Sequence, residues 1–443
     1  MIRHYLTSFF RRLRRSPLTG ALRIGGLAVG LAACFLIGRY VQHETSYDAF
    51  HENAERIQRL LVGSEMFASG LAPPESAEAL KDYPEVAQTL RVRPQSEIIL
   101  NGPSPREEEQ FYYADSTFFE VFSFELARGN PATALDGPGK IVLTPEAARR
   151  HLGRTDVIGE TLEVRDRGPL TVTGVTEPIP TNTHLEFSML ASWDTLGEAD
   201  PNTGLGTDAH TYLLLHDSWD ASSLQEKFDR VAQEGERAAR EATGVWYKNG
   251  VRFDLQPLTA IHTSSGLGGD VRPPRDPDLL YLFGGIGLLI LLIAGGNYVN
   301  LTTAQAADRA GEIGIRKTLG ARSSQIHGQS ILESVGTALV AAVLALALAR
   351  LSLPWFNGLT GRELALFTSS TAGMVATLFG VGVLTGLTSG LYPGLVLGRF
   401  TPTEALTGSE SRPGGRTSVR SFLAGGQFLL AFVLVTGTLA VDR

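Results

Sequence analysis

Cysteine is nearly absent from the 443-residue sequence, which contains only Cys34. That residue lies inside a long apolar run near the N-terminus. The rest of the chain can therefore form no disulfide, and its folded state must depend on packing and hydrogen bonds. Leu31–Cys34 has the form of a lipoprotein cleavage box. The apolar run continues past Cys34, however, so we favour an uncleaved membrane anchor over lipidation.

Motifs for nucleotide, metal and acyl chemistry are also missing. The segment Gly311–Thr318 resembles a phosphate-binding loop only superficially, because Arg316 occupies the position of the required second glycine. His43–Glu44 and His51–Glu52 lack the spacing of a His-Glu-x-x-His zinc site. No Gly-x-Ser-x-Gly elbow is present. The sequence therefore predicts no enzyme activity, no cofactor and no metal site for this chain.

Charged residues are almost absent from five long stretches of the sequence. At about 1.5 Å per residue, a helix of each stretch can cross a hydrocarbon core of about 30 Å. Five such runs of similar length favour membrane-spanning helices over one soluble core. The runs are Ile24–Val41, Leu279–Asn297, Ile331–Leu348, Met374–Leu397 and Phe422–Val441.

The distribution of charge predicts how these spans are oriented. Between Gln42 and Pro277 there are 38 acidic and 21 basic residues, whereas the rest of the chain is basic. Arginine and lysine gather before the first span, between the second and third, and between the fourth and fifth. Because short basic loops stay in the cytoplasm, we expect the N-terminus inside and the acidic segment outside a bacterial cytoplasmic membrane.

Helix and strand signals alternate within the acidic segment. Ala49–Leu61 has helical spacing of its apolar residues. Lys140–Leu143 reads as a strand, and the helix that follows has Thr144 as N-cap, Pro145 at its first position and Gly153 beyond its end. Further elements are predicted as a hairpin of 161–164 with 170–175, strands at 211–215 and 251–255, and a polar helix from Ser222 to about Gly244. The fold class is thus an α-helical polytopic membrane protein with a large extracytoplasmic α+β domain inserted between the first and second transmembrane helices.

The first twenty residues predict an amphipathic helix in the cytoplasmic membrane interface. Their apolar residues recur at helical spacing, with arginines largely between them. A cluster of basic residues that only sets topology is the alternative. The remaining boundaries that we expect are transmembrane helices at 21–41, 278–300, 329–353, 372–398 and 419–441, the outer domain at 42–277, cytoplasmic segments at 301–328 and 399–418, and a short outer loop at 354–371.

The cytoplasmic segment 301–328 predicts a short helix that turns directly into a spanning helix. Ala304–Leu319 is rich in helix formers, and Glu312 precedes Arg316 by four residues, the favourable order for an ion pair. Gly320 is suited to a left-handed helix end, and Ser323 or Ser324 can cap the next helix. Such a connection could pass force from a cytoplasmic partner into the membrane.

Several of these segments resemble FtsX-like permeases. Arg309–Ala321 is similar to the cytoplasmic coupling segment of that family, and Ser389–Pro393 with Phe400–Gly408 resembles its second cytoplasmic loop. The outer domain resembles the MacB-like periplasmic core domain. The segments that carry this second resemblance are Ala114–Phe119, Ile141–Thr144 and Val172–Val175. Ser46–Ile57 also resembles the larger, duplicated permeases of the family.

This resemblance implies the permease subunit of an ABC transporter, which couples ATP hydrolysis by a separate ATPase dimer to export or mechanotransmission. A second permease half or a homodimer partner, membrane lipid and an envelope protein are further implied partners, and nucleic acid is not. The implied contacts of the second loop are Tyr392, Pro393, Phe400 and Pro402. Those with the ATPase are Glu312, Gly314, Ile315, Arg316, Lys317, Leu319 and Gly320.

Two points remain open at this stage. The fifth span resembles the start of the second half of a duplicated permease, so we expect the sequence to be a truncated form. The sequence as a whole also fits a membrane-anchored sensor or ligand-binding protein without transport activity. A sensor needs a cytoplasmic output domain, whereas a permease needs an ATPase partner.

Overall fold

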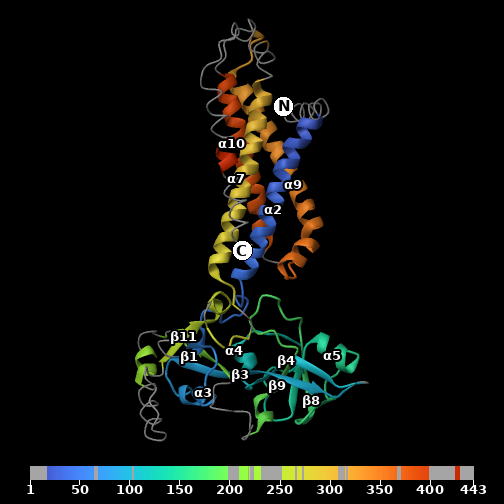
Figure 1. Ribbon diagram of the computed structural model, residues 1–443, viewed down its shortest axis with the longest axis vertical. Helices are drawn as coiled ribbons and strands as arrows, with labels where there is room; N and C mark the ends of the chain where they lie inside the picture. The colour runs from blue at the N-terminus through green and yellow to red at the C-terminus, as the bar shows by residue number, and fades with distance from the viewer. Residues whose placement is uncertain are drawn as a thin grey trace. The chain divides into compact units, whose positions relative to one another are not determined.

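The computed structural model separates the chain into two compact units, shown in Figure 1. One unit comprises residues Met1–His43 and Asp278–Arg443, and the other comprises Glu44–Pro277. We call them the helical unit and the core domain. The residues that the structure describes are 17–63, 68–101, 104–197, 209–217, 219, 224–230, 252–264, 267–271, 274–307, 315, 318–366, 371–398 and 425–429.

Four helices of the described chain are long and apolar enough to cross a membrane. One of them begins at Pro277, whose fixed φ suits a helix start. The helices are α2 (Pro17–Thr45), α7 (Pro277–Ala307), α9 (Ser323–Thr360) and α10 (Thr371–Gly398). The first four predicted spans are confirmed as helices. Residues 1–16 of the predicted interfacial helix lie outside the described residues, as does most of the fifth span, whereas residues 17–20 belong to α2.

The third spanning helix differs from its prediction at both ends. Ser323 and Ser324 lie in its first turn, and the cap position is held by Arg322. The backbone N–H of Arg322 donates to Oε1 of Gln325 at 3.1 Å, so a glutamine rather than a serine satisfies this helix start. The helix also continues through Pro354 to Thr360, past Leu353, and Gly361 ends it with φ +65°.

The core domain is built on one mixed sheet of 11 strands among the described residues. The order of its main path is β11-β1-β10-β3-β4-β9-β6-β8-β5, with parallel pairs β4–β9 and β6–β8. The strands are β1 (Ile57–Gly63), β2 (Ala68–Ser69), β3 (Val86–Ile99), β4 (Arg106–Ala114), β5 (Leu126–Gly129), β6 (Lys140–Leu143), β7 (Thr161–Val164), β8 (Gly168–Thr176), β9 (Met189–Ser192), β10 (His210–Leu215) and β11 (Arg252–Pro257).

Side chains pack against both faces of this sheet. Tyr112 of β4 joins one apolar cluster, while its neighbours Phe111 and Tyr113 join another, as the alternation of a strand requires. The first cluster includes α4 (Phe118–Val121), and the second includes α5 (Pro145–Leu152). The remaining short helices are α3 (Glu75–Leu80), η1 (Trp193–Leu196) and η2 (Leu258–Thr263). The predicted α+β character is confirmed.

The helix that begins at residue 145 has the ends that the sequence predicts. Oγ1 of Thr144 accepts a hydrogen bond from the backbone N–H of Ala147, and Gly153 follows the helix with φ +76°. The hairpin of β7 with β8 and strands β6, β10 and β11 also form as predicted. Of the predicted polar helix, residues 224–230 are helical and the rest lies outside the described residues.

The predicted helix Ala49–Leu61 is wrong. Residues 46–56 form successive turns, in which His51 N bonds to Asp48 O and Ala54 N bonds to His51 O. Such turns repeat every three residues and therefore imitate helical spacing. Ile57 starts strand β1, which is central to its end of the sheet because it pairs with both β10 and β11.

Candidate functional site

The connection between α7 and α9 contains the described part of the predicted coupling segment. Ile315 and Thr318 are helical, and the N–H of Leu319 donates to the carbonyl oxygen of Ile315 at 3.2 Å. Gly320 then takes φ +94°, a left-handed conformation that ends the turn and that residues with a Cβ disfavour. The chain enters α9 directly after it, so the predicted helix terminator is confirmed at this position.

Two large apolar side chains of this connection are exposed. Ile315 exposes 52% and Leu319 exposes 82% of its surface. Because the two residues are four apart on one turn, their side chains lie on the same face and form a small exposed apolar contact. Glu312, Gly314, Arg316 and Lys317 lie outside the described residues, so the predicted ion pair of Glu312 with Arg316 stays a prediction.

The end of α10 lies at the same end of the helical unit as this connection. Glycines of α10 approach α9 so closely that a Cβ at Gly386 would lie 2.6 Å from Cα of Val335, and one at Gly390 would lie 2.7 Å from Cα of Ile331. Because the higher number in α10 meets the lower number in α9, the two helices are antiparallel. The start of α9 therefore adjoins the end of α10, as Figure 1 allows the reader to follow.

This close packing follows from small residues at every fourth position. Gly382, Gly386 and Gly390 form one stripe on α10. Fully buried alanines of α9, such as Ala338 and Ala342, face this stripe. In a membrane, small residues at this spacing let helix backbones approach and gain van der Waals contact. Tyr392 and Pro393 belong to the last part of α10, while Phe400 and Pro402 lie outside the described residues.

A polar cluster links α2, α7 and α9. The guanidinium of Arg23 donates to Oε1 of Gln305 at 3.1 Å and to Oγ1 of Thr337 at 2.9 Å. It also lies 5.5 Å from the ring centre of Tyr298, whose hydroxyl donates to the carbonyl oxygen of Ser334 at 2.6 Å. Arg23 thus fixes the start of α2 against the last turns of α7 and the first half of α9.

Sequence reasoning treated Arg23 only as a charge that sets orientation and did not identify the glycine stripe. Spacing of Gly-x-x-x-Gly within an apolar run was the available signal for Gly386 and Gly390. No comparable signal exists for Arg23, because its partners Gln305 and Thr337 are far away in the sequence.

Catalytic or metal-binding geometry is not evident in the described part of the chain. No group of three histidine, cysteine, aspartate or glutamate side chains there could hold a metal ion. The buried set of Ser188, Glu108 and His151 is not a catalytic triad, because the serine and the histidine both bond to the carboxylate instead of to each other.

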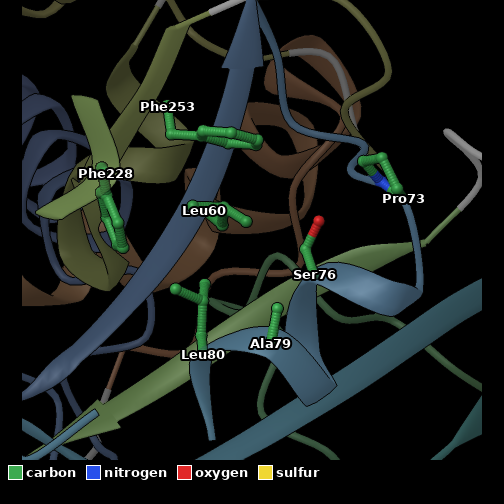
Figure 2. Close-up of a pocket in the computed structure, with 7 residues that line it drawn as sticks. All are labelled: Leu60, Pro73, Ser76, Ala79, Leu80, Phe228 and Phe253. Atoms are coloured by element: carbon green, nitrogen blue, oxygen red, sulfur yellow. The ribbon is translucent and has the colours of Figure 1, made fainter. Parts of the chain in front are cut away.

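An apolar pocket of about 210 Å³ opens in the core domain, shown in Figure 2. Ser76 brings the one hydroxyl among the side chains drawn there, so the pocket would favour an uncharged group. Phe228 and Phe253 lie near the ends of a segment outside the described residues, and we assign no ligand to the pocket. Its lining residues are Leu60, Pro73, Ser76, Ala79, Leu80, Phe228 and Phe253.

Comparisons with known proteins find matches in both units. A family model of the MacB-like periplasmic core domain matches residues 21–231, and one of the FtsX-like permease C-terminal region matches residues 284–402. The macrolide export ATP-binding/permease protein MacB of Bdellovibrio bacteriovorus is 31% identical over 128 residues, which is 29% of this chain and 19% of that protein. MacB of a Shewanella species is 24% identical over 352 residues, or 75% of this chain and 48% of that protein.

The chain therefore spans less than half the length of these curated relatives. Among solved structures, the periplasmic region of MacB from Actinobacillus actinomycetemcomitans matches 46% of this chain and 90% of its own, with 13% identity and a TM-score of 0.31. That score is too low to support an argument.

Proposed function

Because the chain belongs to the family of FtsX-like permeases with a MacB-like periplasmic core domain, we propose that it is the transmembrane subunit of an ABC-type complex. In this proposal a separate ATPase hydrolyses ATP, and the subunit passes the resulting movement across the cytoplasmic membrane for export or mechanotransmission. The chain is a multi-pass membrane protein with a large extracytoplasmic domain. Its N-terminus and the α7–α9 connection would face the cytoplasm, as the basic residues there favour.

The observation that carries the proposal is the α7–α9 connection. Leu319 and Ile315 offer exposed apolar contacts to a partner, and Gly320 joins them to α9 without a flexible linker. A partner that moves this short helix would move the first turn of α9. The charged residues of the segment, Glu312, Arg316 and Lys317, would add electrostatic complementarity at the rim of the contact.

The glycine stripe would distribute such a movement within the helical unit. Since α10 packs on α9 without space for a Cβ at Gly386 or Gly390, the two helices would move together. The end of α10 would bring Tyr392 and Pro393 toward the same partner, with Phe400 and Pro402 beyond them. A dimeric ATPase would then meet two such ends, supplied by a second permease half or a second copy of this chain.

The test is association with an ABC-type ATPase of the same organism. The full chain is expressed with that ATPase in its membrane and purified through a tag on the ATPase. We expect co-purification of the wild type, and weakened association for Glu312→Arg, because the substitution reverses a charge at the contact. One added basic residue reinforces a cytoplasmic loop, so membrane insertion should not change.

Reporter fusions give the control for this test. Fusions at Gly129 should read outside and fusions at Arg322 inside, in the wild type and in the variant alike. A cytoplasmic Gly129 would contradict the orientation. Normal association of Glu312→Arg would contradict a contact between the α7–α9 connection and the ATPase. A chain that never binds the ATPase would instead favour the sensor interpretation.

A further inference from the structure

The two ends of the core domain meet in one cluster with a buried centre. Glu44 is the first residue of the core domain and belongs to the last turn of α2, and Arg275 stands two residues before α7 begins. Between them the chain passes through the whole sheet and returns by way of η2, which contains His262. The entry and exit of the domain are therefore far apart in sequence but close in space.

Four side chains form this cluster, which we call the terminal clasp: Glu44, Tyr47, His262 and Arg275. Nε2 of His262 lies 2.8 Å from Oε2 of Glu44, and Nε of Arg275 lies 3.8 Å from the same oxygen. The backbone N–H of Arg275 donates to the carbonyl oxygen of His262 at 2.7 Å. The ring of Tyr47 stacks on the ring of His262, with centres 3.4 Å apart and an interplanar angle of 4°.

The clasp is shielded from water where its central bond forms. Glu44 exposes 0%, Tyr47 1% and His262 4% of its surface. A carboxylate removed from water to this degree is costly to leave without a partner, whereas a paired one is held strongly. The bond between Glu44 and His262 should therefore be retained rather than exchanged for water.

The entry side of the clasp is anchored in the body of the domain. Asp48, one residue after Tyr47, accepts a hydrogen bond from the hydroxyl of Thr183 at 2.7 Å and lies 2.8 Å from Nδ1 of His184. The backbone N–H of Asp48 donates to the carbonyl oxygen of Asn182 at 2.9 Å. A displacement of Glu44 must consequently pull on both the clasp and the loop at 182–184.

A second buried pair shows what a purely local bond of this kind looks like. Nε2 of His151 lies 3.2 Å from Oε2 of Glu108, which joins α5 to β4 within the domain. Both residues are largely buried, as in the clasp. The chemistry is the same, but this pair does not join the ends of the domain, so it offers a matched control.

We propose that the terminal clasp makes the entry and exit of the core domain move as one body, so that α2 and α7 act on the domain jointly and do not pull its ends apart. This inference rests on the proposed function for its purpose, since joint movement matters only if the helices transmit force. Glu44, Tyr47, His262 and Arg275 are positioning residues in this account.

The experiment measures the separation of the two ends in the full chain, reconstituted in lipid nanodiscs. Cys34→Ala removes the native cysteine, and spin labels are attached to cysteines at the exposed positions Thr45 and Asp276. Electron paramagnetic resonance should give one narrow distance distribution. We expect His262→Ala to lose that narrow distribution, and His262→Gln, which keeps an N–H donor for Glu44, to restore much of it.

His151→Ala is the matched control and should keep the narrow distribution. Thermal unfolding of each variant separates a released clasp from an unfolded domain, and Tyr47→Leu replaces His262→Ala if the latter does not fold. An unchanged distribution in folded His262→Ala or Tyr47→Leu would overturn the proposal. The distance measurement needs no ATPase. A chain that fails to bind the ATPase would therefore refute the proposed function, whereas only the distance distribution decides whether the clasp joins the two ends.

Discussion

The helical unit and the core domain are each stabilised by a different kind of internal contact. In the helical unit, glycines without side chains let two helix backbones come into contact, as at Gly386 and Gly390 against α9. In the core domain they are made by large rings and buried ion pairs, such as Phe118 stacked on Phe124 and Arg59 paired with Asp270. Lipid tails are as apolar as leucine, so apolar burial does not drive helices together in a membrane as it does in water. Van der Waals contact between closely packed backbones stabilises the helix pair instead.

The largest expected effect breaks the packing of the helical unit. Gly386→Leu puts a side chain where even a Cβ would lie 2.6 Å from Val335, so overpacking should cost about 1–3 kcal/mol or more. Gly380→Leu on the same helix meets nothing within 4 Å and should be nearly neutral. Thermal unfolding of the full chain in detergent measures both. Equal stability of the two variants would show that the stripe is not a packing interface.

A smaller and more gradual effect is the loss of core-domain stability at acidic pH. Burial lowers the pKa of His51 to about 4, with the Asp48 carboxylate opposing it, and burial with the charge of Arg59 lowers the pKa of His210 to about 3. In the unfolded chain both have a pKa of about 6.5, so unfolding takes up protons below that pH. The free energy of unfolding should therefore be unaffected by these groups above pH 7 and fall as the pH decreases from about 6.5 to about 4.

Glu108 extends this loss to lower pH. Its burial raises the pKa, but hydrogen bonds from His151 and Ser188 and the charge of Arg150 outweigh burial and lower the pKa to about 2. The stability that this carboxylate contributes is present above about pH 4.5 and is lost as the pH falls toward 2. Chemical denaturation at several pH values measures these losses.

A histidine variant tests the sign of the pH effect. His51→Gln should reduce the steepness between pH 6.5 and 4 by about one proton, leaving that of His210. If stability instead rose on acidification through this range, the neutral state of the buried histidines in the folded domain would be disproved.

The sequence predicted some elements of the core domain and not others. Helix α5 could be read from Thr144, Pro145 and Gly153, because capping acts within a few residues. The segment 49–61 was misread, since turns imitate a helix locally and only the pairing of β1 with β10 and β11 decides the matter. Long-range contacts of this kind leave no local pattern.

The same limit applies to the candidate site. Gly320 was predictable because a helix terminator is local, and its φ of +94° agrees. Arg23 and the terminal clasp were not, because each joins residues far apart in the chain. The glycine stripe lies between these cases. Its spacing is visible in the sequence, but the partner helix is not.

The central claim is that the α7–α9 connection passes movement between an ATPase and the spanning helices, and ATP hydrolysis by the ATPase in complex with the full chain tests it most directly. Gly320→Val and Gly361→Val place a β-branched residue in a left-handed conformation just before and just after α9, each with nothing within 4 Å of its Cβ. Each should cost about 1–2 kcal/mol locally. Only Gly320→Val should alter the direction of the short helix that precedes α9. We predict that the permease-dependent change in ATP hydrolysis is lost with Gly320→Val and kept with Gly361→Val, whereas an equal response to both variants would contradict the account.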